Sequence, residues 1–462
     1  MSADVQHAAL RRAITLRSGG PVPPPVASQA RRIFIDTLGC ALAGRAVAEV
    51  QALEEQSSAL EPGHFRWPGG LPLTTHAAAQ VLAMAATWHE ACEGHALAHG
   101  RPGVPVIAAL LPLALARNDD FGRFIDALVL GYEVGARAGA WLRIRAGMHV
   151  DGNWPALGVA AAAAHLLGLG NGGIERAIDI AACQLPTSLY LPVRAGCTAR
   201  NTYLGHSAAL GLDAAFAVRA GIDAPGEALD FYARHFAAPA DAAPGAEEDL
   251  ILDAYLKPFA AVRHVHYGAV AARHVRQALV AGTQHIEKIV LTVYQEAITY
   301  CGNRAPRTPI QAQFSLSFGV AAMLRFGDIE PATYEAASFN DVELRRLEVL
   351  VELRVDEELT RAGRRGATLT VHAGGAEVEH TVSVIAGDPA RPLSADQVTA
   401  KFMRYAGTGV PTERCERFLA ALDVAPRDMP LRSLWAMLHG EASTDHAMQP
   451  HPSSHQPPKE AP

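Results

Sequence analysis

Aromatic and charged residues are scarce in this chain of 462 residues. Phe, Trp and Tyr make up 6% of the sequence and the four charged residue types 19%, whereas 49% is hydrophobic. Such a composition excludes an intrinsically disordered chain, which has few hydrophobic residues and a high net charge. The formal net charge of −7 offers no basic field to a phosphate backbone, so no nucleic-acid partner is expected.

The six cysteines contain no CxxC pair. This pattern argues against a zinc ribbon or a disulfide framework and suits a reducing compartment. The N-terminus has no cationic segment followed by an apolar one, so no secretory signal is evident. Gly, His and Arg interrupt the Ala-rich runs before they reach the length of a membrane span. We therefore expect a cytoplasmic protein that does not enter membranes.

Two domains are expected, because the chain is longer than one ordinary core supports. To about Ala260 the hydrophobic periodicity is helical, with no convincing alternating strand, and Ser28 is placed to cap one of these helices. After Gln284 the segments HIEKIVLTVY and LEVLVELRV show β-branched alternation, and a hairpin is expected about the Gly374-Gly375 turn.

A helix is expected from Ile310 to Phe326, between two of these strands. Helical character returns at LSADQVTAKFMRYAG, where Ser394 and Gln397 form a capping box. The His-, Pro- and Ser-rich end has little to bury and is expected to be disordered. The predicted fold is mainly α, with an all-helical domain over 1–265 and 395–440, a smaller α+β domain over 266–394 and a disordered tail over 441–462.

One loop organises the rest of the chain, the segment HEACEGHALAHGRPGVP from His89 to Pro105. It carries two Glu, three His and an Arg between two Ala-rich helices. Loops held by rigid helices are where catalytic groups gather. Three further polar islands, around His149, Arg200 and Lys257, interrupt otherwise apolar helices. We expect the four segments to converge on one pocket for a small anionic substrate.

The start of this loop is similar to a zinc motif, because His89-Glu90-x-x-Glu93 is one substitution from HExxH. That motif needs both His ligands on one helical face. Gly94 and Pro102 argue against a continuous helix here, so no metal site is predicted.

Two of the polar islands stand just before a helix. His149 is followed by Asp151 and Asn153, just before the N-terminus of a predicted helix, where free main-chain N–H groups favour an anion. Arg200-Asn201 stands before another, so a guanidinium and a helix dipole can hold one carboxylate together.

The third island starts at Lys257. Arg263, His264 and His266 follow it closely, and a lysine placed among other basic groups can serve in proton transfer. The shared cationic character of the islands is the main argument for an anion site.

Several longer segments match a known family in order and spacing, from about 31 to 407. They are RRIFIDTLGCALAG, EACEGHALAHGRPGVPVIAALLPLA, GMHVDGNWPALGVAAAAAHLLGL, ARNTYLGHSAALGLDAAFA, LKPFAAVRHVHYGAVAA, RTPIQAQFSLSFGVAAML and LSADQVTAKF. With these the chain resembles the MmgE/PrpD family, which includes 2-methylcitrate dehydratase and cis-aconitate decarboxylase. The resemblance implies a large all-helical domain, an α+β lid inserted before the last helices, a homodimer and no cofactor.

The resemblance also implies site residues. Family members carry an acidic cluster of the type D-x-D-D-G-H followed by H-P-G. In this sequence Glu90, Cys92 and Glu93 stand at the acidic positions, His95 at the first His, and Arg101 in place of the second. Further family positions fall on His149, Arg200, Lys257 and His266, and on Phe318 where some members have Tyr.

Arg101 and Cys92 depart from the family pattern. Arg stays charged in proteins and cannot donate the proton that a His would donate at this place, and Cys92 removes a carboxylate. The resemblance therefore allows a substrate other than methylcitrate in a pocket that still binds charge.

We expect a cofactor-free lyase that dehydrates a small 2-hydroxy di- or tricarboxylate similar to 2-methylcitrate. Removing a proton beside a carboxylate requires a base, and cations must hold the developing negative charge. The candidate catalytic residues are His149, Lys257, His95 and Glu90. The candidate substrate-binding residues are Arg101, Arg200, Glu93, His266 and Asn201. The alternatives are a cofactor-free isomerase or epimerase, a decarboxylase of a cis-aconitate-like acid, and a catalytically inactive carboxylate-binding protein.

Overall fold

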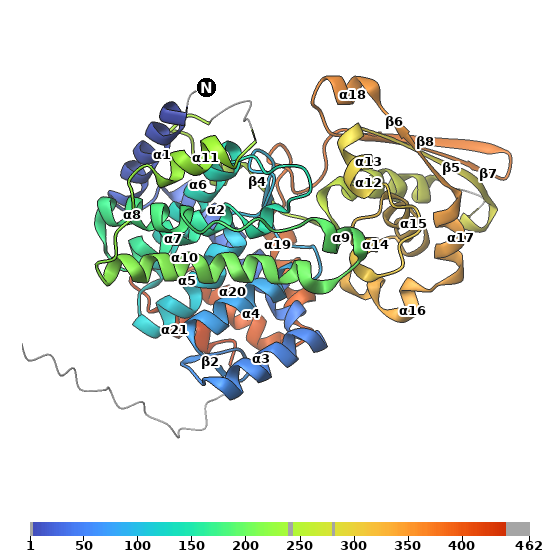
Figure 1. Ribbon diagram of the computed structural model, residues 1–462. Coiled ribbons are helices and arrows are strands. Elements are labelled where there is room, and N and C mark those ends of the chain that lie inside the picture. Colours follow the sequence, from blue (N-terminus) through green and yellow to red (C-terminus); the bar gives the residue numbers. More distant parts are fainter. Residues whose placement is uncertain (1–2, 239–243, 280–281, 440–462) are drawn as a thin grey trace, which may run out of the picture.

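The chain forms two lobes of different composition. The computed structural model describes residues 3–238, 244–279 and 282–439, so the tail expected to be disordered lies outside the described residues. Figure 1 shows a large helical lobe beside a smaller lobe of helices and a four-stranded sheet. This arrangement confirms the predicted fold class. Within the described residues, no helix is both long enough and apolar enough to cross a membrane.

The larger lobe is built of helices from both ends of the sequence. They are α1 (Ala3–Ser18), α2 (Pro24–Arg45), α3 (Ala48–Leu60), α4 (Thr75–Thr87), α5 (Gly103–Arg117), α6 (Phe121–Trp141), α7 (Pro155–Leu166), α8 (Gly170–Ala182), α9 (Leu191–Ala195), α10 (Tyr203–Arg219), α11 (Ala228–His235), α19 (Ala395–Ala406), α20 (Thr412–Asp423) and α21 (Leu431–Ala436). Helix α19 packs against α2, although more than 300 residues separate them.

The start of α2 differs from the sequence prediction. Pro24 occupies the first helical position, where its missing N–H needs no partner and its fixed φ suits the helix. Ser28 therefore lies inside α2, and the prediction that it caps a helix is wrong. The consecutive prolines set this boundary one turn earlier than a polar cap would.

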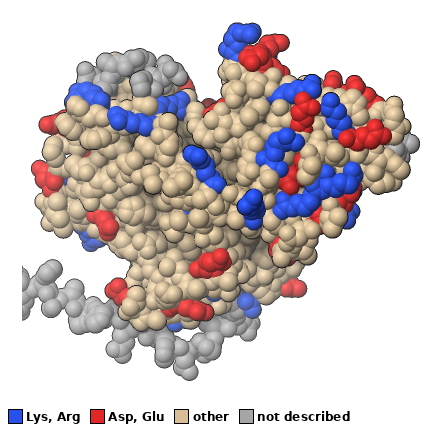
Figure 2. Space-filling view, turned by 45° about the vertical axis from the view of Figure 1, so that its right-hand side comes forward, with Lys and Arg blue, Asp and Glu red and all other residues tan. Residues whose placement is uncertain are grey.

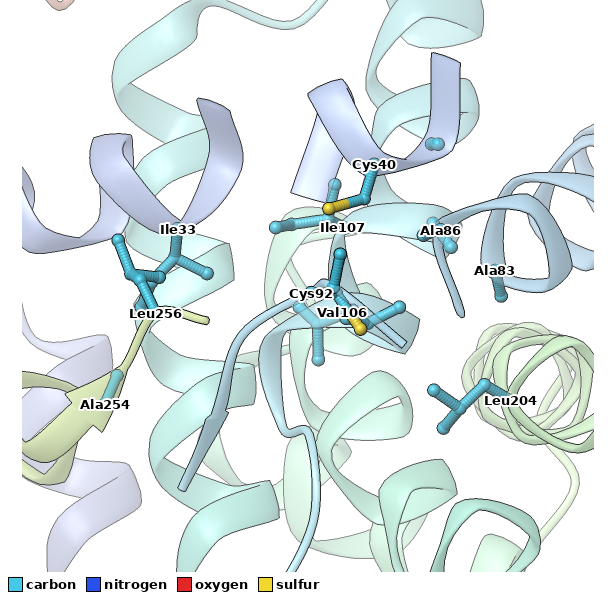
Figure 3. Close-up of a cluster of buried hydrophobic side chains, with 14 of the residues drawn as sticks. Ile33, Cys40, Ala83, Ala86, Cys92, Val106, Ile107, Leu204, Ala254 and Leu256 are labelled. Atoms are coloured by element: carbon cyan, nitrogen blue, oxygen red, sulfur yellow. The ribbon is translucent and has the colours of Figure 1, made fainter. Parts of the chain in front are cut away.

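Helices α5 and α7 form the centre of the larger lobe. Every residue of α5 from Gly103 to Leu115 is buried, as is every residue of α7 from Pro155 to Ala164. A helix that is apolar all round must be enclosed by others, and α5 and α7 are covered by α4, α6 and α10. Figure 3 shows part of this core, where Cys92 lies in one hydrophobic cluster with Cys40 of α2 and Val106 of α5.

Four very short strands lie within the helical part, so the prediction of no strand before Ala260 is wrong in detail. They are β1 (Phe65–Arg66), β2 (Pro72–Leu73), β3 (Gly94–His95) and β4 (Ala254–Tyr255). Strands of two residues are too short to show an alternating pattern. Nevertheless, β3 pairs antiparallel with β4, with Gly94 opposite Tyr255. This pairing brings the chain around Lys257 beside the loop that follows His89.

The smaller lobe has one mixed sheet covered by helices. The strands are β5 (Ile286–Val293), β6 (Val351–Val355), β7 (Ala367–Ala373) and β8 (Ala376–Val382), and the helices are α12 (Arg263–Ala278), α13 (Gln295–Cys301), α14 (Pro309–Gln313), α15 (Leu316–Phe326), α16 (Ala336–Phe339), α17 (Val342–Leu350) and α18 (Glu357–Arg361). The strand order is β6-β5-β7-β8, and only the β5–β6 pair is parallel. Alternate residues of β7 are buried, and α12 packs against β7 and β8.

Local turn and cap signals are borne out in this part of the chain. Gly374 and Gly375 have φ of 57° and 78° and join β7 to β8, as the two-residue hairpin requires. Ser394 and Gln397 form the expected capping box at the start of α19. The single helix expected from Ile310 to Phe326 is two, because the Ser315 side chain accepts the N–H of Phe318 and starts α15 anew.

Small residues allow the central helices to touch, and this generates a stability prediction. A Cβ added at Gly158 in α7 would lie 2.6 Å from the carbonyl oxygen of Gly131 in α6, whereas a Cβ at Gly172 in α8 would meet nothing within 4 Å. Gly158→Ala should lower the free energy of unfolding by about 1–3 kcal/mol, because the two backbones must separate. Gly172→Ala should be neutral or stabilise by up to about 1 kcal/mol through helix propensity. Thermal denaturation of both variants compares them directly, and equal Tm values would contradict the close helix contact.

Candidate active site

A cavity of about 240 Å³ lies where the two lobes meet. The larger lobe contributes the loop from Glu90 to Arg101, the segment around His149, and Tyr190; the smaller lobe contributes the start of α12, residues of α13, and Arg365. In Figure 2 the surface is hollowed between the lobes, with Lys and Arg side chains on both sides of the hollow. Among the described residues that line the cavity, the cations are Arg101, Arg143, Lys257, Arg263 and Arg365, and the carboxylates are Glu90 and Glu296.

The Glu90 carboxylate is the centre of a buried charge cluster. Its Oε1 accepts a hydrogen bond from Arg101 Nη2 at 2.9 Å and another from Arg200, and its Oε2 accepts one from Lys257 Nζ at 2.9 Å. Arg101 also lies 3.3 Å from Asp151 Oδ2. All of these side chains are buried. One carboxylate thus fixes three cations that come from three separate segments of the chain.

The main chain that carries Glu90 is held by side chains from distant segments. Helix α4 ends at Thr87, and Glu90 has a positive φ of 53°, which a residue other than glycine rarely adopts. The carbonyl oxygens of this turn accept hydrogen bonds from elsewhere in the chain: Thr87 O from Arg200 Nη1 at 3.4 Å, Trp88 O from Gln313 Nε2 at 3.0 Å, Glu90 O from Lys257 Nζ at 2.9 Å and Ala91 O from Lys401 Nζ at 2.6 Å. These bonds give hydrogen-bond donors to carbonyl groups that have no partner within the helix or the turn that follows it.

The cluster keeps Glu90 charged. Burial alone would raise the pKa of its carboxyl, but the charges of Arg101, Lys257 and Arg200 lower that pKa well below its usual value. Glu93 shows the opposite behaviour, because burial raises its pKa to about 8. The two acids of this loop therefore differ in charge at neutral pH.

His149 lies on the cavity wall between the rings of Tyr190 and Tyr203. Burial lowers its pKa to about 4, so the imidazole is neutral at pH 7. Its Nδ1 accepts the main-chain N–H of Asp151 at 3.2 Å and lies 3.9 Å from the Asp151 carboxylate. The first contact favours the tautomer with the proton on Nε2, and the second favours a proton on Nδ1. In either tautomer Nε2 is the nitrogen left to meet a ligand, since no described residue pairs with it.

The smaller lobe closes the cavity with residues that the sequence did not single out. Arg365, in the loop before β7, lies 3.6 Å from Glu296 of α13, and both line the cavity together with Tyr300. Nothing in the local sequence around Arg365 distinguishes it from a solvated surface arginine. Arg263, which starts α12, is instead paired with Asp388.

The structure separates the candidate residues into two groups. Those at the cavity wall are Glu90, His95, Arg101, His149 and Lys257, and those behind it are Glu93, Arg200, Asn201 and His266. The four polar segments therefore do converge, but four of the nine candidates do not reach the cavity.

Three members of the second group are bonded to the wall or to the helix behind it, and the contacts with substrate expected for them stay predictions. Arg200 bonds the carboxylate of Glu90 and the side-chain oxygen of Asn201. Glu93 Oε1 accepts the first N–H groups of α5 from Gly103 and Val104, at 2.8 and 3.2 Å, as a side-chain oxygen that caps a helix does. The sequence alone could not show that the anion beside Arg200 is Glu90.

Both predicted histidines other than His149 are engaged by the main chain. His266 Nε2 contacts the carbonyl of Ala261 at 3.0 Å, with its ring beside Phe259. His95 lines the cavity, but its Nε2 contacts the Leu250 carbonyl at 3.0 Å and its Nδ1 accepts the N–H of Ala98 at 3.3 Å. With both ring nitrogens occupied, His95 shapes the loop.

In the part of the chain that the structure describes, no group of three or more His, Cys, Asp or Glu side chains is arranged to hold a metal ion. The His89–Glu93 segment lies in the turn after α4, so His89 and Glu93 do not share a helical face.

Removing the charge of Glu90 should destabilise the protein. Glu90→Gln leaves three buried cations without their common anion, a change expected to cost about 3–5 kcal/mol. Because the pKa of Glu90 is lowered on folding, its contribution is fully present above its ordinary value of 4.5 and is lost as the pH falls through the folded value. Thermal unfolding from pH 8 to pH 3 should therefore show a Tm gap between wild type and variant that narrows in acid. A gap that is constant or widens in acid would contradict this assignment.

Comparison with known proteins identifies the family. Residues 18–240 match the MmgE/PrpD N-terminal domain, and residues 259–425 match the MmgE/PrpD C-terminal domain. Human cis-aconitate decarboxylase is 27% identical over 365 residues, which cover 72% of this chain and 73% of the human protein. Because the two domain matches run in order and together span most of the sequence, the chain belongs to the MmgE/PrpD family.

Proposed function

We propose that the protein is a cofactor-free lyase that dehydrates a small 2-hydroxy di- or tricarboxylate. The observation that carries this proposal is the cavity between the lobes, lined by five cationic side chains, two carboxylates and the neutral imidazole of His149. An excess of cations over carboxylates in the lining of this site favours a substrate with more than one negative charge.

Arg101 is the residue best placed to bind a substrate carboxylate. One of its terminal nitrogens pairs with Glu90 and Asp151, and the other donates to Cys92 Sγ at 3.6 Å, which holds the guanidinium in place. The N–H groups that these contacts leave over can meet a substrate carboxylate. Arg365 of the smaller lobe, which lies 3.6 Å from Glu296 on the cavity wall, can hold a second carboxylate. This arrangement would fix the orientation of the reacting carbon before chemistry starts.

His149 and Lys257 are the groups proposed to move protons. To act as the base, His149 must first shift its ring proton from Nε2 to Nδ1, on the side of the Asp151 carboxylate, which lies 3.9 Å away. Its Nε2 can then take a proton from the carbon next to a substrate carboxylate. Two of the three N–H groups of Lys257 are bonded to Glu90, which leaves the third for substrate. Lys257 would protonate the departing hydroxyl group, so that a C–H and a C–O bond break, a C=C bond forms and water leaves. Return of the proton from His149 to Lys257 through solvent restores the enzyme.

Decarboxylation is the second candidate, because the human relative is a cis-aconitate decarboxylase. The same groups would then stabilise the carbanion that remains after carbon dioxide leaves, and one of them would protonate it. An isomerase or epimerase needs only removal and return of a proton. A binding protein without activity would use the cations alone. The homodimer and the cytoplasmic location expected from the sequence stay predictions.

A panel of citrate-like hydroxy acids and cis-aconitate-like alkene acids, each incubated separately in D2O and followed by NMR, tests the proposed reaction. Dehydration predicts a new alkene signal, with loss of the signals of the hydroxy acid. Carbon dioxide release would identify a decarboxylase, and solvent deuterium in unchanged substrate an isomerase. Binding in a thermal-shift assay with no chemical change in any acid would favour the inactive binding protein. Each of these three outcomes would overturn dehydration.

His149→Ala should lower turnover by about 10²–10⁴-fold, the usual contribution of a positioned acid or base. The Tm should change little, because the imidazole is neutral and makes one main-chain hydrogen bond. The matched control is His206→Ala, since His206 is exposed on α10 and should leave turnover unchanged. A His149→Ala variant as active as this control would remove His149 from the mechanism.

A further inference from the structure

The C-terminal part of the chain reaches the candidate site through Lys401. This residue lies on α19, is 3% exposed, and does not line the cavity. Its ammonium group pairs with the buried Asp36 of α2 and donates a hydrogen bond of 2.6 Å to the carbonyl oxygen of Ala91. The hydrogen bond to Ala91 is therefore additional to the ion pair between Lys401 and Asp36.

The contact with Ala91 lies directly beside the unusual backbone of Glu90. The Glu90 carbonyl is held by Lys257 and the Ala91 carbonyl by Lys401, so two ammonium groups fix two successive carbonyls. Glu90 keeps its positive φ of 53° between them. A residue other than glycine persists in this conformation only when its surroundings hold it there, and the orientation of the Glu90 carboxylate depends on it.

Asp36 is the second member of this buried pair. Its carboxylate accepts a hydrogen bond from the ammonium of Lys401, and burial raises its pKa, which the charge of Lys401 and the nearby main chain of Glu93 oppose. Helices α2 and α19 thus bring one buried ion pair beside Cys92, which itself lies in the hydrophobic cluster of Figure 3. The positions of Asp36 and Lys401 are fixed relative to each other, because α2 and α19 pack along each other.

We infer that Lys401 is a positioning residue, which holds the Ala91 carbonyl so that the Glu90 carboxylate faces Arg101, Arg200 and Lys257. This inference rests on the proposed function for its consequence in turnover, although its structural part stands alone. The last helices of the chain would then act on the site without touching substrate.

Three variants separate this role from that of a simple ion pair. Lys401→Met removes the bond to Ala91 and leaves Asp36 without its partner. The double variant Asp36→Asn/Lys401→Met also removes the bond to Ala91, but it leaves no unpaired charge at positions 36 and 401. Its Tm should therefore be higher than that of Lys401→Met. The control Asp36→Asn keeps Lys401 and its bond to the Ala91 carbonyl. It should have a lower Tm than wild type but a kcat/KM close to wild type.

The double variant distinguishes a positioning role of Lys401 from a role as the partner of Asp36 alone. We expect its kcat/KM to stay about a hundredfold below wild type, since small displacements of catalytic groups have effects of this size, while its Tm recovers. Its crystal structure should show Glu90 with a changed φ and a displaced carboxylate. If kcat/KM recovers with the Tm, or if Glu90 keeps its place in the crystal, Lys401 is only the partner of Asp36 and the inference is overturned. If wild type converts no acid of the panel, the proposed function fails, while the crystal structures still test the positioning role.

Discussion

The interaction on which the site depends is the pairing of three buried cations with the Glu90 carboxylate, which Asp151 assists at Arg101 and Arg200. Arg101, Arg200 and Lys257 come from segments up to 167 residues away from Glu90, and each is paired with its side chain. Burying any of these charges alone would be prohibitive, so the segments can only be assembled together. The loop, the turn before α10 and the strand pair β3–β4 are therefore parts of one electrostatic unit, and the shape of the cavity follows from it.

The helical scaffold provides the rigidity that such a unit needs. The central helices α5 and α7 are buried along nearly their whole length, and glycine contacts between α6 and α7 leave the backbones little room to shift. Protein interiors packed in this way transmit strain. Polar groups held by this scaffold can keep an unfavourable conformation, such as the positive φ of Glu90, that an isolated loop would lose.

Sequence reasoning succeeded where the signal is local. The hairpin at Gly374-Gly375 and the cap at Ser394 depend on residues at most a few positions apart, and both are found as predicted. The four polar segments and the family were also recognised. What could not be predicted is which anion each cation meets. A basic residue next to a helix start looks the same whether it binds substrate or a protein carboxylate, and Arg200 does the latter. The sequence did not indicate a role for Lys401 or Arg365, because Lys401 contacts a carbonyl 310 residues away and Arg365 lines a cavity that both lobes enclose.

Gln313 connects the smaller lobe to the turn that carries Glu90. Its amide, from α14 of the smaller lobe, is bonded to the carbonyl of Trp88, two residues before Glu90 on the larger lobe. Any hinge movement that parts the lobes must withdraw this donor as well as Arg365 and Glu296. The contact between the lobes therefore also holds the turn that bears the central carboxylate, so the position of the smaller lobe and the geometry at Glu90 depend on each other.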